Sequence, residues 1–286
     1  MTVLEAIQKS TEFLGKKNVE SPRLQTELLL AHVLKMPRMK LYLNFDRALT
    51  PAETDALREL VKRRGQREPL QHIVGSTSFC GFELAVSRHA LVPRPETEML
   101  AELGWQFLST LNSEPSTALD FGTGTGCIAI AIAAKCPNAK ITALDISAAA
   151  LALAKENAAR NNVAERIEFL LGDGFAALPP DARFDLVLSN PPYIASAEIA
   201  TLDPEVRDFD PRAALDGGTD GLDFYRRLAT SAKKSLKPDG KIMLEFGDGQ
   251  AAAIKMIFET EKWIVEAVQE DYSQRARIII ARTNEI

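Results

Sequence analysis

The sequence lacks the usual marks of a nucleic-acid-binding or membrane protein. Its 286 residues carry a net charge of −5. The one clearly basic triplet, at residues 62–64, is typical of the solvated end of a helix, so extended contact with a nucleic-acid backbone is not expected. No apolar run approaches the roughly 20 residues that a membrane-spanning helix needs, and no membrane contact is expected.

Cysteine and histidine are also scarce, with three of each in the chain. Cys80, Cys127 and Cys136 have no metal-ligand spacing and are odd in number. Without a signal-peptide pattern, they indicate reduced thiols and a cytoplasmic protein. The histidines are isolated from one another and from carboxylates at ligand spacing, which favours packing or surface roles over catalysis. We therefore expect no metal site.

The most informative motif that is present is Asn190-Pro191-Pro192-Tyr193, which follows an apolar run at 184–188. The run predicts a buried strand, and two prolines end it and stiffen the backbone that follows. The side-chain oxygen of Asn190 and the carbonyl of Pro191 can then each accept a hydrogen from a planar –NH2 group, on whose face Tyr193 can stack. An ordinary proline-rich turn after a strand is the alternative.

A glycine-rich loop lies about seventy residues earlier, between an expected strand at 118–121 and an expected helix at 128–135. Three glycines at alternate positions let a loop turn tightly and approach a ligand closely. The dinucleotide fingerprint needs its third glycine one place later, where this chain has Cys127. The residues expected to contact a ligand are Gly122, Thr123, Gly124, Thr125 and Gly126. A plain strand-to-helix turn is the alternative.

The next predicted strand, 140–145, ends in an acid. A carboxylate at this place can accept both hydroxyls of a ribose. Asp145 could equally cap the helix that begins near Ser147.

The third predicted strand, 166–171, ends in a turn that contains Asp173, Gly174 and Phe175. Asp173 can accept from an adenine amino group and Phe175 can pack on the ring, although an ordinary acidic turn would look the same. Glycine loop, two acidic turns and Asn-Pro-Pro-Tyr thus follow four successive strands. In an open α/β sheet the ligand lies beyond those carboxyl ends, so the sequence predicts one site there.

The front of the chain, residues 1–70, has helical patterning. Ser21-Pro22 and the capping box that starts at Thr50 predict two helix starts. Residues 71–90 suggest a β-hairpin linker, and residues 91–286 the sheet-containing domain. Because the front has no candidate catalytic cluster, we expect it to hold a partner, with a structural cap as the alternative.

Taken together, the motifs resemble one family over nearly the whole chain: the protein-(glutamine-N5) methyltransferases that modify peptide chain release factors. The segments that carry the resemblance are 71–75, Phe79 with 81–82, 92–98, 120–126, 190–193, 217–222 and 244–247. Adenine-N6 DNA methyltransferases share only the tetrapeptide and the general fold. An adenine-N6 or other exocyclic-amine methyltransferase acting on nucleic acid is the alternative function.

The resemblance implies an α/β chain with a Rossmann-like S-adenosylmethionine-dependent methyltransferase domain, a small N-terminal helical domain and a β-hairpin linker. S-adenosyl-L-methionine would be the cofactor, held by the 122–126 loop, Asp145, the 173–175 turn and Asn190. The partner would be a release factor, methylated on the glutamine of its Gly-Gly-Gln motif by a monomeric enzyme that binds no nucleic acid directly.

The poor nucleophilicity of an amide nitrogen suggests catalytic roles for these residues. Asn190 and Pro191 would orient the substrate amide, Tyr193 would pack behind it and the 194–216 loop would grip the substrate. Two departures from the family pattern stand out. Gly174 takes the place of an aromatic residue that would pack on adenine, and Asp210-Pro211 replaces a glutamate-proline pair.

Overall fold

The computed structural model describes residues 1–111 and 115–283 and divides the chain into two compact units. The first unit comprises Met1–Ser76 and Asp203–Phe209; the second comprises Thr77–Leu202 and Asp210–Ile286. The sequence placed the end of the helical front at residue 70 and treated 71–90 as a linker, whereas the first unit extends to Ser76 and also takes in 203–209. Among the described residues, no helix is long and apolar enough to cross a membrane.

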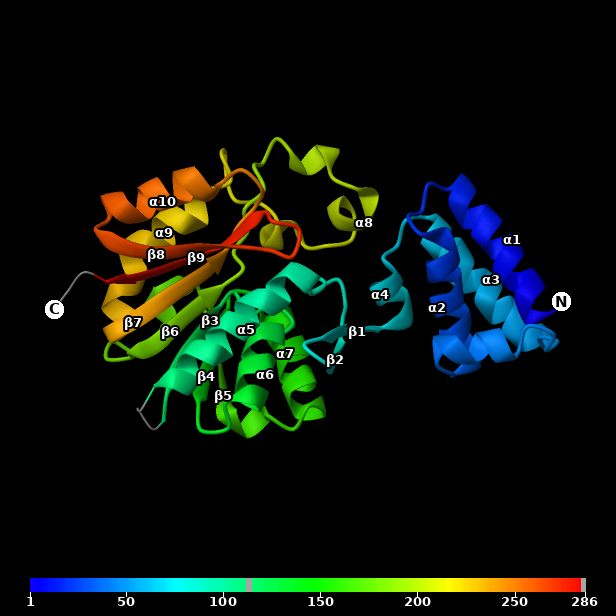
Figure 1. Ribbon diagram of the computed structural model, residues 1–286, viewed down its shortest axis with the longest axis horizontal. Coiled ribbons are helices and arrows are strands. Elements are labelled where there is room, and N and C mark those ends of the chain that lie inside the picture. Colours follow the sequence, from blue (N-terminus) through cyan, green and yellow to red (C-terminus); the bar gives the residue numbers. More distant parts are fainter. Residues whose placement is uncertain (112–114, 284–286) are drawn as a thin grey trace. The chain divides into compact units, whose positions relative to one another are not determined.

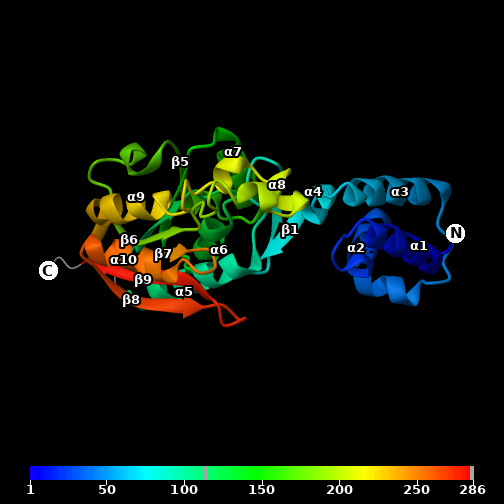
Figure 2. The ribbon, with the colours of Figure 1, turned by 90° about the horizontal axis from the view of Figure 1, so that it is seen from above.

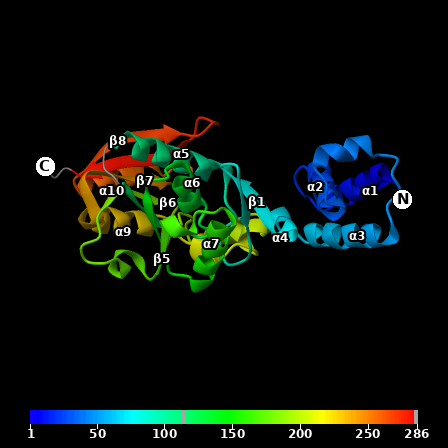
Figure 3. The same cartoon turned by 90° about the horizontal axis from the view of Figure 1, so that it is seen from below.

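The first unit is a helical bundle in which α3 packs beside α1 and α2 (Figures 2 and 3). Its elements are α1 (Val3–Lys16), α2 (Pro22–Leu34), η1 (Arg38–Leu43), α3 (Pro51–Gly65), α4 (Leu70–Val74) and α8 (Pro204–Arg207). The predicted capping box is confirmed, because Thr50 and Glu53 each accept the other's backbone N–H. Ser21 precedes α2 as predicted, but in a left-handed conformation in which, within the described chain, its side chain makes no capping hydrogen bond.

The 203–209 segment belongs to the first unit because of a buried charge cluster. Glu205 accepts from Arg64 at 2.6 Å and from Arg67 at 2.7 Å. The Arg64 side chain is only 4% exposed. A buried guanidinium needs a partner to offset the loss of hydration, and α8 supplies it. The loop that follows Asn-Pro-Pro-Tyr therefore has its middle in one unit and both ends in the other.

The second unit is built on a seven-stranded sheet of order β5-β4-β3-β6-β7-β9-β8 (Figure 1). The strands are β3 (Thr117–Phe121), β4 (Lys140–Asp145), β5 (Ile167–Leu171), β6 (Phe184–Ser189), β7 (Leu236–Glu245), β8 (Trp263–Glu270) and β9 (Ala276–Thr283). The first five are parallel, and β9 pairs antiparallel with β7 and β8. The chain adds strands on one side of β3 and then crosses to β6, which creates a switch point between β3 and β6.

Helices cover both faces of this sheet, because its strands are apolar on both sides. One core cluster includes Ala118 and Leu186, and the other includes the next residues along, Leu119 and Val187. The helices on one face are α5 (Pro95–Thr110), α6 (Cys127–Lys135) and α7 (Ala148–Arg160); those on the other are α9 (Asp223–Ser231) and α10 (Ala251–Thr260) (Figure 1). Short helical turns complete the unit: η2 (Ala164–Arg166), η3 (Gly174–Ala177), η4 (Ile199–Thr201), η5 (Arg212–Ala214) and η6 (Ala232–Ser235).

The predicted hairpin forms from β1 (Ser76–Phe79) and β2 (Phe82–Ala85) and is fixed to the second unit. The fully buried amide of Asn157 accepts from the Ala85 N–H at 2.7 Å and donates to the Ala85 carbonyl at 3.0 Å. This pair of bonds completes an edge of the hairpin with a side chain of α7. From Thr77 onward, the hairpin is thus part of the sheet-containing unit.

Candidate functional site

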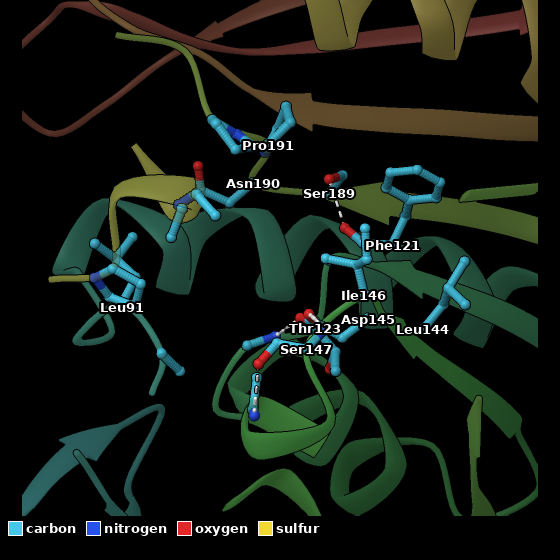
Figure 4. A pocket seen from close by; sticks show the side chains of 18 of the residues that line it. Leu91, Phe121, Thr123, Leu144, Asp145, Ile146, Ser147, Ser189, Asn190 and Pro191 are labelled. Carbon is cyan, nitrogen blue, oxygen red and sulfur yellow. Dashed lines mark hydrogen bonds between the residues drawn. The ribbon is translucent and has the colours of Figure 1, made fainter. Parts of the chain in front are cut away.

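A cavity of about 520 Å³ opens beyond the carboxyl ends of β3, β4 and β6, at the switch point of the sheet. Figure 4 shows Asn190 and Pro191 on one side of it and Asp145 and Ser147 on the other. Every residue that lines the cavity belongs to the second unit. The motifs that the sequence placed on one sheet edge therefore do converge.

The glycine-rich loop is anchored to the end of β4. The N–H groups of Gly122 and Thr123 both donate to the Leu144 carbonyl, at 2.8 and 3.0 Å, and Gly124 N–H donates to Asp145 Oδ2 at 2.9 Å. Gly122 and Gly124 have φ angles of 75° and 55°, which glycine adopts without the strain that a side chain would cause. Residues 122–125 all line the cavity, with their backbone fixed before any ligand arrives.

Asp145 lies at the cavity and is not the cap of the following helix. Its Oδ1 accepts from Ser147 N–H at 2.8 Å, and Ser147 itself caps α7 by accepting from Ala150 N–H at 3.2 Å. A carboxylate has about four lone-pair positions, and two backbone donors leave it able to accept further hydrogen bonds from a ligand. Ser147, and not Asp145, therefore caps α7, and the geometry of Asp145 is compatible with a ribose-binding role.

Gly126 has a different place from its neighbours. It is the N-cap of α6 with φ 81°, and a Cβ on it would lie 3.0 Å from the Cβ of Ala154 on α7. Among the described residues that line the cavity, Gly126 is absent. Its contribution is to let α6 and α7 approach closely, which sets the start of the helix behind the loop.

The turn after β5 differs from its predicted arrangement. Asp173 and Gly174 line the cavity, but the ring of Phe175 packs against Phe121 in the core, with centroids 5.1 Å apart. Phe175 is not among the described lining residues, so its predicted packing on adenine lacks support. Asp173 pairs with Arg227 at 2.7 Å. The apolar side chain exposed at the cavity here is Ile146, which follows β4 and is 66% exposed.

Asn190 is held by a hydrogen bond on the side of its amide nitrogen. Nδ2 donates to the hydroxyl of Thr97, in the first turn of α5, at 3.1 Å. Just before it, the Ser189 hydroxyl donates to the Phe121 carbonyl at 2.6 Å, which ties the ends of β6 and β3 together. Asn190 and both following prolines line the cavity, and the stiff dipeptide keeps the end of β6 extended.

Tyr193 supports the turn from behind. Its backbone carbonyl accepts from the Gln250 side chain at 2.9 Å, and burial raises the pKa of its hydroxyl to about 12. It is absent from the described cavity lining, so the predicted stacking on a substrate amide lacks direct support. The Gly-Gly-x-Asp-Gly-Leu segment packs on the same turn. A Cβ on Gly217 would lie 2.8 Å from the Pro192 carbonyl oxygen, and a Cβ on Gly221 would lie even closer to the Tyr193 carbonyl oxygen.

Three acidic residues near the site were not assigned roles from sequence. Asp210 forms an ion pair with Arg94 at 2.7 Å. Asp120 accepts from the Thr123 hydroxyl at 2.6 Å and from Ala129 N–H at 3.2 Å, and burial raises its pKa to about 7. Glu245, at the end of β7, is 2% exposed. A single sequence gives no local signal for the partners of these acids. Each acid nevertheless stands at the end of a strand or within one of the motifs described above.

Comparison with known proteins covers both units. Residues 5–75 match the family model described as PrmC N-terminal domain, and residues 104–203 match the one described as methyltransferase small domain. A release factor glutamine methyltransferase from Geobacter sulfurreducens is 44% identical over 259 residues, which is 90% of this chain and 88% of that protein. One from Chlorobaculum tepidum is 40% identical over 282 residues, 96% of this chain and 95% of that protein. A methyltransferase structure from Pyrococcus furiosus, with a TM-score of 0.51, 22% identity and coverage of 70% and 88%, supports the fold alone.

Proposed function

Because this chain belongs to the release factor glutamine methyltransferase family, we propose that it methylates a release factor. The methyl group passes from S-adenosyl-L-methionine to N5 of the glutamine in a Gly-Gly-Gln motif. The observation that carries the proposal is the setting of Asn190 at the cavity, with its amide nitrogen engaged by Thr97 and Pro191 next to it. Two oxygen acceptors on a rigid turn suit an incoming –NH2 group.

The cavity residues fit this cofactor. The volume of about 520 Å³ lies in the range of about 300–1,000 Å³ that is common for small-molecule sites. The Asp145 carboxylate would accept the ribose hydroxyls, the 122–125 loop would lie along the cofactor, and Ile146 offers an apolar surface for the adenine ring. When bound, the cofactor supplies a methyl group on a positively charged sulfur.

The protein's part in the reaction is to position and polarise the substrate amide. An amide nitrogen is a poor nucleophile because its lone pair is delocalised into the carbonyl group. Asn190 Oδ1 and the Pro191 carbonyl would each accept one N–H hydrogen, which raises electron density on the nitrogen and aims its lone pair. Held in this way, the reactants need little further reorganisation. The proton can leave to water after transfer, so no strong base is required beforehand.

The helical unit would bind a surface of the release factor that is remote from the reacting glutamine. It exposes large apolar side chains: Leu24, Met39, Tyr42 and Leu43 are 43%, 67%, 39% and 86% exposed. Exposed apolar groups gathered on η1 and the start of α2 suit a protein partner. We further propose a cytoplasmic monomer that contacts the protein substrate and no nucleic acid, in line with the net charge of −5.

The test is methylation by the full chain of purified release factors with isotope-labelled cofactor, followed by peptide mass mapping. We expect the label on the glutamine of the Gly-Gly-Gln peptide. The matched control is a release factor in which that glutamine is replaced by asparagine. Label on an adenine of DNA or RNA, with none on a release factor, would replace the proposal by the nucleic-acid alternative.

A further inference from the structure

The orientation of the Asn190 side-chain amide depends on the residues that contact it on the side away from the cavity. The oxygen and nitrogen ends of an amide have nearly the same shape, so the hydrogen bonds around it decide which end faces the cavity. Nδ2 donates to Thr97 Oγ1 at 3.1 Å. The amide oxygen then points away from Thr97 and remains the group with which Asn190 can grip a substrate –NH2. In a flipped amide, the –NH2 group of Asn190 would face the –NH2 group of the substrate, and both are hydrogen-bond donors.

The Thr97 hydroxyl cannot fix that orientation alone. A hydroxyl both donates and accepts, so it could equally donate to the oxygen of a flipped Asn190. Thr97 is 3% exposed, which leaves little access for water to decide the direction. A third group that only accepts would settle it by taking the hydroxyl hydrogen.

Glu245 has the properties of that third group. Its carboxyl lies at the end of β7 and is 2% exposed, and the neighbouring Thr97 hydroxyl and Asn190 amide lower its pKa. Its Oε2 has no hydrogen-bond partner within residues 1–111 and 115–283. The Tyr225 hydroxyl donates to the backbone carbonyl of Glu245 at 2.7 Å and fixes this end of the strand. An ionised carboxylate only accepts, so it would draw the Thr97 hydrogen and leave a Thr97 lone pair for the Asn190 N–H.

The charge state of Glu245 therefore matters. Burial raises the pKa of its carboxyl to about 7; Thr97 and Asn190 lower it, as does the charge of Arg277, whereas the charge of Glu96 raises it. Two tyrosine hydroxyls, those of Tyr193 and Tyr225, also face its charge. Once protonated, the Glu245 carboxyl can donate to the Thr97 hydroxyl. Thr97 is then free to donate to Asn190, and the orientation of the Asn190 amide is no longer fixed.

We propose that Glu245 is a positioning residue for methyl transfer, acting through Thr97 to keep the oxygen of Asn190 turned toward the substrate. The inference rests on the proposed methyltransferase function. It assigns a task to the glutamate of the Leu244-Glu245-Phe246-Gly247 segment and to the threonine of the Pro-Arg-Pro-Glu-Thr-Glu segment. These segments are far apart in the chain and meet behind Asn190.

The kinetic test compares Glu245→Gln and Thr97→Val with the wild type on a release factor. We expect kcat to fall about 10-fold or more in each variant, the effect of one lost hydrogen bond of about 1.4 kcal/mol, with KM changed less than about 3-fold. Thr97→Ser retains the hydroxyl and should recover most of the rate. Glu266→Gln, a partly exposed glutamate of β8, is the matched control. Thermal unfolding of all variants separates misfolding from misorientation.

The pH profile gives a readout that a merely structural role would not change. In the wild type kcat should rise with pH through about 7, and in Glu245→Gln that dependence should vanish. Independently of activity, the side-chain amide NMR signals of Asn190 should titrate near pH 7 in the wild type and not in Glu245→Gln. Unchanged kcat and unchanged titration in Glu245→Gln would overturn the inference. A wild type that methylates no release factor would instead overturn the proposed function, and the NMR titration would still decide the role of Glu245.

Discussion

Arg94 and Asp210 form an ion pair in which the guanidinium Nη2 lies 2.7 Å from the carboxylate Oδ2. The pair joins the Pro-Arg-Pro segment before α5 to the loop that returns from the first unit, and Val92 N–H also approaches Asp210, at 3.4 Å. Burial raises the pKa of Asp210 even with Arg94 beside it. The Asp210 carboxylate is thus almost fully buried and has the Arg94 guanidinium for charge compensation.

Arg94→Met should destabilise the second unit and loosen the loop residues that line the cavity. Breaking a buried pair costs about 3–5 kcal/mol; because Arg94 is about one-third exposed, we discount this to about 1–2 kcal/mol. We also expect weaker cofactor binding, since Pro211 lines the cavity. Calorimetric melting and titration with S-adenosylhomocysteine measure both. Arg160→Met removes an exposed pair with Glu156 and is the control; equal melting temperatures for the two variants would contradict the prediction.

Asn190→Ala should lower kcat by about 10²-fold or more and leave the fold intact. The variant loses an oriented acceptor whose interaction strengthens as charge develops on the substrate nitrogen. Methylation of a release factor under single-turnover conditions measures the loss. Asn161→Ala, which removes an amide that binds the Glu83 carbonyl on the surface, is the control. Near-normal turnover by Asn190→Ala would remove the residue from the proposed mechanism.

Asp145→Ala should weaken cofactor binding by about 1.5–3 kcal/mol, because the ribose loses a charged acceptor. It also removes the partner of Gly124 N–H, which holds the loop, so the upper end of that range is expected. Calorimetry with S-adenosylhomocysteine gives the dissociation constant. Asp248→Ala changes an exposed carboxylate with only a 3.7 Å ion pair and should bind as the wild type does. Equal affinities for both variants would reject the ribose assignment.

The local signals in the sequence predicted the elements and the edge on which the site forms. Strand ends at Phe121 and Asp145 and the capping box at Thr50 each have a short-range physical cause, and the structure confirms them. The strand predicted at 184–188 runs one residue further, to Ser189. The assignment of Phe175 to the ligand stays a prediction, because its ring packs against Phe121, with centroids 5.1 Å apart, and Phe121 itself lines the cavity.

What the sequence could not provide is pairing between residues far apart. Thr97 and Asn190 are 93 positions apart, and Glu205 and Arg64 are 141 apart. Nothing near either residue of such a pair distinguishes it from an ordinary polar side chain. The inclusion of 203–209 in the helical unit follows from one such pair, which is why domain boundaries drawn from patterning alone treated the front as one continuous stretch.

Buried Asp120 gives the protein a stability that decreases with rising pH. Burial raises its pKa from the ordinary 3.8 to about 7 in the folded protein. Its favourable contribution is therefore fully present below about pH 4 and is lost as the pH rises through about 7. Asp120→Asn stays neutral, so its melting temperature should fall less than that of the wild type between pH 5 and pH 8. Because Glu245 acts in the same direction, the Asp120→Asn/Glu245→Gln double variant should show the flattest profile; parallel profiles would contradict the assignment.

The exposed side chains of η1 test whether the helical unit holds the substrate. Met39→Ser/Leu43→Ser removes two apolar groups from the surface of the first unit, where they are 67% and 86% exposed. If they contact the release factor, KM for the whole protein should rise about 10-fold or more, since an interface side chain that matters contributes more than about 1 kcal/mol. KM for a short Gly-Gly-Gln peptide should stay unchanged, because the peptide reaches only the cavity.

The control for this pair lies on the other unit. Met256, on α10, is 67% exposed like Met39, so Met256→Ser removes a similar apolar group from a surface with no proposed role in binding. It should leave KM unchanged for both substrates. If the η1 variant treats the release factor and the peptide alike, these side chains contribute nothing to partner binding. The helical unit would then act as a structural cap, with α8 and its Glu205 contacts as its link to the loop after Asn-Pro-Pro-Tyr.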